Sequence, residues 1–309
     1  MGIRHLNARQ LGLICRYSIR HSLRSGSALV FMLLAVFFGL TVANSIISPF
    51  EAAVAQAGPA GMSPQAVEQN LVSFARPAVQ WAIAPHESAD PAAQRAAEER
   101  TRRWADYLLD ERPALLSAIF LVLVFGMPLL IPFGAFNQTA GDIGNRGLRY
   151  LLLRTERANI FFGRLLATMA FTVVVQAVVI VTIALYLWLK VGVYGGGEIA
   201  SWSLLGFVAI AVSGAPYVAV CAWISATRDS AMTSLVVANA VIGGVLLAPV
   251  LGAFAWEPAR FATYLLPWGV QNDLLGPSAG TVAVAFGACV LYTVAFVWLG
   301  ARTFERRDL

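Results

Sequence analysis

Six separate stretches of about 20 apolar residues constrain the folding of this chain more than any other feature. None has an aspartate, glutamate, lysine or arginine in its interior, and only 13% of all residues are charged, against about 25% in soluble domains. Hydrocarbon cannot satisfy backbone N–H and C=O groups, so such stretches must be helical. The sequence therefore predicts an all-α integral membrane protein with six transmembrane helices at 28–47, 114–133, 165–187, 202–224, 232–251 and 281–299.

The charges between these stretches predict the orientation. If the N-terminus lies inside, the inner segments hold 14 basic and 5 acidic residues, a net charge of +9. The outer segments then hold 8 basic and 12 acidic residues, a net charge of −4. The positive-inside rule therefore predicts a multi-pass membrane protein with both termini in the cytoplasm. The high alanine content and the single lysine indicate a GC-rich bacterial genome, so the expected location is the bacterial cytoplasmic (inner) membrane. Since orientation explains the basic excess, nucleic acid is not expected as a partner.

The sequence lacks a nucleotide-binding motif and the ionisable side chains within apolar stretches that many energy-coupled membrane proteins use. It contains no GxxxxGK[ST] motif, and its only lysine, Lys190, is followed by Val191 and Gly192. The three histidines lie outside the apolar stretches, and no stretch holds an acid that could carry a coupling proton. We therefore expect no catalytic residue, no cofactor and no metal site in this chain, which is not predicted to be an enzyme.

Two segments outside the apolar stretches have helical patterns of their own. Residues 1–24 predict an amphipathic interfacial helix, either a lipid anchor or also a surface for a cytoplasmic partner, before a six-helix transmembrane domain at 25–309. The extracytoplasmic loop at 48–112 predicts a helical hairpin, because Ser63-Pro64 and Asp90-Pro91 are typical helix starts. That hairpin would either cap the outer face or take part in gating or docking an outer protein.

Two further segments connect later stretches. The outer segment at 252–280 is rich in aromatic residues and prolines, which suits either short helices dipping into the outer leaflet or an ordinary surface loop. The inner segment at 134–164 contains a predicted helix from 145 to 157, with Leu148, Leu151 and Leu152 on one face. The other side carries the candidate contact residues Arg146, Arg149, Tyr150, Leu153 and Arg157. From the residues alone, this helix either lies at lipid phosphates or contacts a partner.

The inner segment resembles the inner loop of ABC-2 type permeases, the membrane subunits of type V ABC transporters. The likeness rests on GDIGNRGLRYLLLR at 141–154 and FGRLL at 162–166, together with the six-helix layout. The resemblance implies that residues from Asp142 to Arg157 form a cytoplasmic coupling helix. It also implies two copies of a cytoplasmic ABC ATPase, which carry ATP and Mg²⁺, and a second permease copy in a homodimer or heterodimer.

Two functions follow from this resemblance, and a third does not need it. The first is export of an amphipathic or lipid-like substrate along the permease dimer interface, which the charge-free apolar stretches favour. The second is mechanical transmission, in which ATP hydrolysis inside drives loop 48–112 to act on an extracytoplasmic protein while nothing crosses. The third is a stand-alone membrane protein that has no ATPase.

Overall fold

The computed structural model describes residues 7–24, 26–57, 63–83, 91–144, 147–254 and 257–307, and within these ranges the regular structure is entirely helical. Six of the helices are long and apolar enough to cross a membrane, so the chain has the architecture of a multi-pass membrane protein. These six are α2 (Ser27–Ala57), α5 (Ala114–Ala135), α8 (Arg157–Lys190), α9 (Gly196–Thr227), α10 (Ala231–Phe254) and α11 (Ala279–Arg306).

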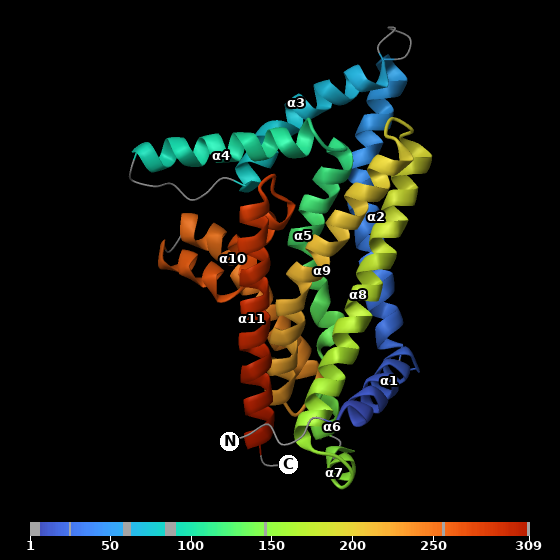
Figure 1. The fold of residues 1–309 in the computed structure, drawn as a ribbon, viewed down its shortest axis with the longest axis vertical. Helices are drawn as coiled ribbons and strands as arrows, with labels where there is room; N and C mark the ends of the chain where they lie inside the picture. Colours follow the sequence, from blue (N-terminus) through green and yellow to red (C-terminus); the bar gives the residue numbers. More distant parts are fainter. Residues whose placement is uncertain are drawn as a thin grey trace.

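The long helices form one bundle, in which α5 and α9 are the most buried (Figure 1). Glycines allow these central helices to approach closely. A Cβ added to Gly206 of α9 would lie 2.4 Å from the Phe120 ring of α5, and one added to Gly126 would lie 2.3 Å from Phe38 of α2. Packing of small against large residues suits a membrane interior, where lipid tails are as apolar as the side chains and contact must come from shape.

Both ends of the bundle carry shorter helices (Figure 1). Across one end lie α3 (Pro64–Ile83) and α4 (Pro91–Leu109), which pack against each other. At the opposite end lie α1 (Ala8–Arg24), α6 (Ala140–Gly144), α7 (Gly147–Leu152) and the last turn of α11. The amphipathic end helix, the inner loop and the C-terminal region are thus on the same side of the bundle, opposite the hairpin.

All six spanning helices extend beyond the predicted apolar stretches. Helix α2 continues to Ala57, although the sequence places the start of the outer loop at residue 48. At this level Glu51 of α2 forms an ion pair with Lys190, the last residue of α8, with 3.4 Å between Oε1 and Nζ. Hydropathy marks only the lipid-facing length of a helix, whereas side chains of neighbouring helices stabilise the turns beyond it.

The outer segment between α10 and α11 contains three short 3₁₀ helices: η2 (Glu257–Leu265), η3 (Pro267–Gly269) and η4 (Gln271–Leu275). Gln271 of η4 is fully buried, and its amide fastens η4 to the bundle. Its Oε1 accepts a 2.9 Å hydrogen bond from the Tyr217 hydroxyl of α9, and its Nε2 donates to the Val124 carbonyl of α5 over 3.3 Å. The predicted outer segment therefore consists of short 3₁₀ helices, and the side-chain amide of Gln271 connects the last of them to the central helices α5 and α9.

The inner segment differs from the predicted single helix over 145–157, and that prediction is wrong. Helix α7 ends at Leu152, a turn follows, and Arg157 begins α8. The chain reverses here so that α8 can enter the bundle, which a continuous helix would prevent. Asn145 and Arg146 lie outside the described residues, as does the side chain of Arg149.

Candidate functional site

An ion pair between Asp142 of α6 and Arg164 of α8 lies at the end of the bundle that carries α1, α6 and α7. We call this the inner end and the opposite one the outer end, after the orientation predicted from the charges. The Arg164 side chain is only 12% exposed, and its Nη1 also donates a 2.6 Å hydrogen bond to the carbonyl of Gln138. Buried charges need such partners, because an unpaired one loses the solvation that water would give it. The pair therefore links α6, α8 and the turn that follows α5.

Helix α6 is also held by the end of α9. Ser225 is fully buried, and its Oγ accepts hydrogen bonds from the backbone N–H groups of Thr139 (2.9 Å) and Ala140 (3.0 Å). At the other end of α6, a Cβ on Gly144 would lie 2.2 Å from the carbonyl oxygen of Asp229. Any side chain there would push α6 away from the α9–α10 turn, so glycine is required by this close approach.

Helix α7 and the turn after it present two large apolar side chains to the surroundings. Tyr150 is 76% exposed and Leu153 is 83% exposed, whereas Leu148 of the same segment is buried. Exposed aromatic and aliphatic side chains at one site are typical of a contact surface. The sequence places Tyr150 and Leu153 among the arginines, and the structure leaves both free for contact.

Arg157 has a role within this chain that the sequence does not indicate. Its Nη1 donates hydrogen bonds to the backbone carbonyls of Glu305 (2.9 Å) and Arg307 (2.6 Å), just beyond the bundle. Arg307 in turn donates to the carbonyls of Ala226 (2.6 Å) and Arg228 (3.2 Å) and forms an ion pair with Asp229. Together these contacts fasten the last turn of α11 to the start of α8 and the end of α9.

Helix α1 packs along the first turns of α8. The Gln10 Oε1 accepts hydrogen bonds from Thr155 Oγ1 and Asn159 Nδ2, each of 2.9 Å. A Cβ on Gly163 would lie 2.8 Å from Ile14, so a glycine of α8 makes room for the apolar side of α1. Helix α1 exposes the arginines of its polar stripe on the opposite side, namely Arg16, Arg20 and Arg24. Movement of α8 at this end would therefore displace α1.

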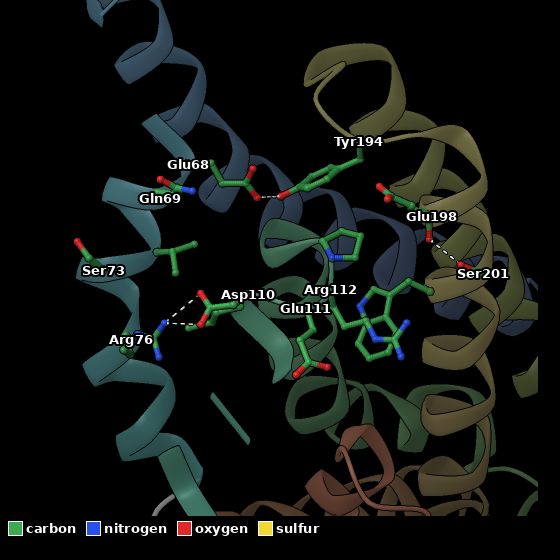
Figure 2. A pocket seen from close by; sticks show the side chains of 14 residues that line it. Glu68, Gln69, Ser73, Arg76, Asp110, Glu111, Arg112, Tyr194, Glu198 and Ser201 are labelled. Atoms are coloured by element: carbon green, nitrogen blue, oxygen red, sulfur yellow. Dashed lines mark hydrogen bonds and ion pairs between the residues drawn. The ribbon is translucent and has the colours of Figure 1, made fainter. Parts of the chain in front are cut away.

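A polar pocket of about 520 Å³ lies at the opposite end, beneath the hairpin (Figure 2). Its walls come from α3, from the junction of α4 and α5, and from Tyr194 and the first turns of α9. The Tyr194 hydroxyl donates a hydrogen bond to the Glu68 carboxylate of α3 and accepts one of 3.3 Å from the backbone N–H of Leu115 in α5. Tyr194 thus joins the hairpin to the bundle.

Burial changes the ionisation of both partners in this contact. It raises the pKa of the Glu68 carboxyl above the usual 4.5, although the hydrogen bond from Tyr194 acts in the opposite direction. Burial also raises the pKa of the Tyr194 hydroxyl, which therefore stays protonated and remains a donor.

A second, apolar groove of about 500 Å³ lies between the outer halves of α8 and α9. Small residues such as Ala184 and Ala200 open the space, and Trp188, Leu204 and Phe207 form its walls. Such a lining suits a hydrocarbon chain. Among the described residues, no cluster of three or more His, Cys, Asp or Glu side chains could hold a metal ion.

The sequence analysis named Asp142, Tyr150 and Leu153 as candidate contact residues but did not name the residues that hold α6 in place. Ser225, Asp229 and Gln138 come from elements distant in the chain, and no local pattern marks them. A scan against protein-family models and a search of curated proteins both returned no match. The functional argument therefore rests on the six apolar helices, which are compatible with a membrane transport protein, and on the two ends of the bundle.

Proposed function

We propose that this chain is the membrane-spanning permease subunit of an ATP-driven ABC transporter. Two copies of a cytoplasmic ATPase would bind at the end that carries α1, α6 and α7, and would supply ATP, Mg²⁺ and the hydrolysis step. A second permease copy would complete the complex. The observation that carries the proposal is the exposure of Tyr150 and Leu153 on the segment that packs against α6, which is itself held to α8 by the ion pair between Asp142 and Arg164.

The contacts behind α7 support transmission of movement into the bundle. A push on Tyr150 or Leu153 reaches α6, whose Asp142 is paired with Arg164 of α8. The same Arg164 holds the Gln138 carbonyl, at the end of α5. In this proposal, the coupling segment is α6 and α7, with Arg146 and Arg149 pairing with acids on the ATPase, whereas Arg157 is used within the chain.

The substrate proposed is an amphipathic or lipid-like molecule, exported along the interface between two permease copies. The central helices hold no acidic or basic side chain through their apolar stretches, so a strongly ionic substrate would cross without a partner. The apolar groove between α8 and α9 adds a surface on which a hydrocarbon chain can lie.

A second function is supported by the outer end. The hairpin of α3 and α4 is joined to the bundle by Glu68 and Tyr194 and by an ion pair between Arg100 of α4 and Asp273 of η4. Movement of the spanning helices would therefore move the hairpin. In a mechanotransmitting ABC subunit, that movement would act on an extracytoplasmic protein without translocation of a substrate.

The decisive experiment is purification of this chain from its native membrane, with identification of any bound ABC ATPase and measurement of ATP turnover in the complex. Replacing Tyr150 with alanine and Leu153 with aspartate should release the ATPase or uncouple its turnover. The same changes at Tyr264 and Leu265, which are 72% and 64% exposed at the outer segment, provide the matched control. An unchanged yield and turnover in the Tyr150/Leu153 variant would refute this coupling surface.

A further inference from the structure

One face of α2 is exposed over most of its length and changes character halfway along the helix. Its exposed side chains in the inner half are apolar: Leu29, Val30, Leu33, Leu34 and Phe37. Its exposed side chains in the outer half are polar: Thr41, Asn44, Ser45 and Ser48. No exposed position of α8 between 166 and 185, or of α11 between 283 and 295, carries a polar side chain. The polar half-face of α2 is therefore a local feature that needs its own explanation.

Asn44 places a carboxamide at the depth of the lipid tails. It lies within the apolar stretch of α2, on the inner side of Glu51, whose ion pair with Lys190 is at the outer end of the bundle. The seven residues between Asn44 and Glu51 correspond to about 10 Å along the helix axis. Hydrocarbon offers no hydrogen-bond partner, so an exposed amide at this depth is unfavourable unless a protein group covers it.

The Asn44 amide is only half satisfied within the chain. Its Oδ1 accepts a 2.8 Å hydrogen bond from the Tyr186 hydroxyl of α8, but no described residue accepts from its Nδ2. The Ser48 hydroxyl likewise has no hydrogen bond to a described residue. Pro49 has no N–H, so the carbonyl of Ser45 lacks its usual helical donor. The outer half of this face therefore offers both donors and acceptors to whatever covers it.

The exposed face also has the spacing of a helix-pairing seam. Alternating steps of four and three residues separate Val30, Leu34, Phe37, Thr41, Asn44 and Ser48. This pattern repeats every seven residues, the period that keeps one helix face against a partner helix in a left-handed crossing. Such crossings are the commonest in transmembrane bundles, where asparagine, serine and threonine form hydrogen bonds between helices. The face therefore fits another helix along its whole length.

From these observations we infer that α2 pairs with α2 of a second copy of this chain, in parallel, about a two-fold axis normal to the membrane. Both copies insert in the same direction, so the axis brings equal residues together at equal depth. Asn44 then meets Asn44 of the second copy, and the carboxamide is complementary to itself: each Nδ2 donates to the Oδ1 of the other. A single asparagine in such a seam fixes the register of the two helices.

The chemistry of the seam favours a second copy over an unrelated helix. Its side chains carry no charge, so the axis brings no like charges together. Each of its polar side chains can both donate and accept, as a symmetric contact requires. The inference rests on the second permease copy of the proposed function, but on neither the ATPase nor the substrate.

The test is disulfide cross-linking of the full chain in cell membranes. The three native cysteines, Cys15, Cys221 and Cys289, are first replaced by alanine. Single cysteines are then introduced along the seam as Phe37→Cys, Thr41→Cys, Asn44→Cys and Ser48→Cys. A disulfide needs Cα atoms within about 7 Å, so oxidation should produce cross-linked dimers at these positions. Val174→Cys on α8 and Val290→Cys on α11, at positions that are also exposed, are the controls and should remain monomeric.

A second measurement isolates the contribution of the amide. Asn44→Leu should lower the dimerisation constant by at least about threefold, the average effect of one hydrogen bond between membrane helices. Tyr186→Phe is the matched control, because it removes the same hydrogen bond within the chain but leaves the Asn44 amide in the seam. It should leave the constant unchanged. Energy transfer between labelled chains in phosphatidylcholine vesicles, at several lipid-to-protein ratios, gives the constant.

The outcomes separate this inference from the proposed function. Equal cross-linking at the seam and at the control positions, an unchanged constant in Asn44→Leu, or cross-links from α2 to a different protein would overturn it. A two-copy complex without α2 cross-links would overturn the inference and leave the proposed permease pair intact. Seam cross-links in a complex that binds no ATPase would support the inference and contradict the proposed transporter.

Discussion

Arg164 and Asp142 form an ion pair that joins the first turns of α8 to α6, and the same guanidinium holds the carbonyl of Gln138. One side chain thus connects the end of α5 and the start of α8 with α6, the helix that precedes α7. A single guanidinium therefore holds these three backbone segments together.

Reversing one charge of this pair should cost more than exchanging the two charges. Arg164→Asp alone would leave two carboxylates facing each other, and we expect a loss of about 3 kcal/mol in the free energy of unfolding, reduced from the value for fully buried pairs because Asp142 is 36% exposed. The double variant Asp142→Arg with Arg164→Asp should recover most of this loss. Thermal unfolding in detergent measures the stability, and coupled ATP turnover measures the function. A double variant no better than the single one would contradict the pairing.

The close contact between α5 and α9 gives a prediction about packing. Gly206→Ala places a Cβ 2.4 Å from the Phe120 ring, which is fully buried and cannot move aside. We expect a loss of about 1–3 kcal/mol, the usual cost of overpacking a core. The matched control is Gly243→Ala on α10, where an added Cβ meets nothing within 4 Å. Equal unfolding temperatures for the two variants would show that α5 and α9 do not pack in this way.

The six spans could be predicted from the sequence because the bilayer imposes a length and a composition on each helix separately. Helix starts with local chemistry, such as Ser63-Pro64, are equally visible: the Ala66 N–H donates a 3.3 Å hydrogen bond to Ser63 Oγ, and α3 begins at Pro64. The break between α7 and α8 was not predictable, because Arg157 is held by carbonyls of residues near 305. The outer pocket could not be predicted for the same reason, because the residues that line it come from segments far apart in the chain.

Glu68 predicts a pH dependence at the outer end. Because burial raises its pKa in the folded protein, the folded state binds the proton more tightly than the unfolded state does. Its contribution to stability is fully present below the ordinary value of 4.5 and is lost as the pH rises through the raised value. Glu68→Gln should remove this component. Unfolding temperatures of the wild type and the variant, from about pH 4 to about pH 7, test the expectation, and parallel curves would contradict it.

Arg307 predicts a stability effect at the inner end. It satisfies the carbonyls of Ala226 and Arg228 at the end of α9, where helices leave acceptors unpaired and favour a positive charge. Arg307→Ala should destabilise this end by about 1–2 kcal/mol. Faster trypsin cleavage after Arg228, without any change in cleavage of the hairpin, is the expected measurement. Arg302→Ala, an exposed residue of α11 outside this contact, is the control.

The contact between Arg157 and the carbonyl of Arg307 also has a consequence for synthesis. The two residues are 150 positions apart, and at about 5–20 residues per second a ribosome needs roughly 8–30 seconds to pass from one to the other. During that interval α8 can already be inserted while its first arginine has no partner and the end of α9 is uncapped. The contacts of Arg157 and the cap on α9 therefore cannot form until residue 307 has been synthesised.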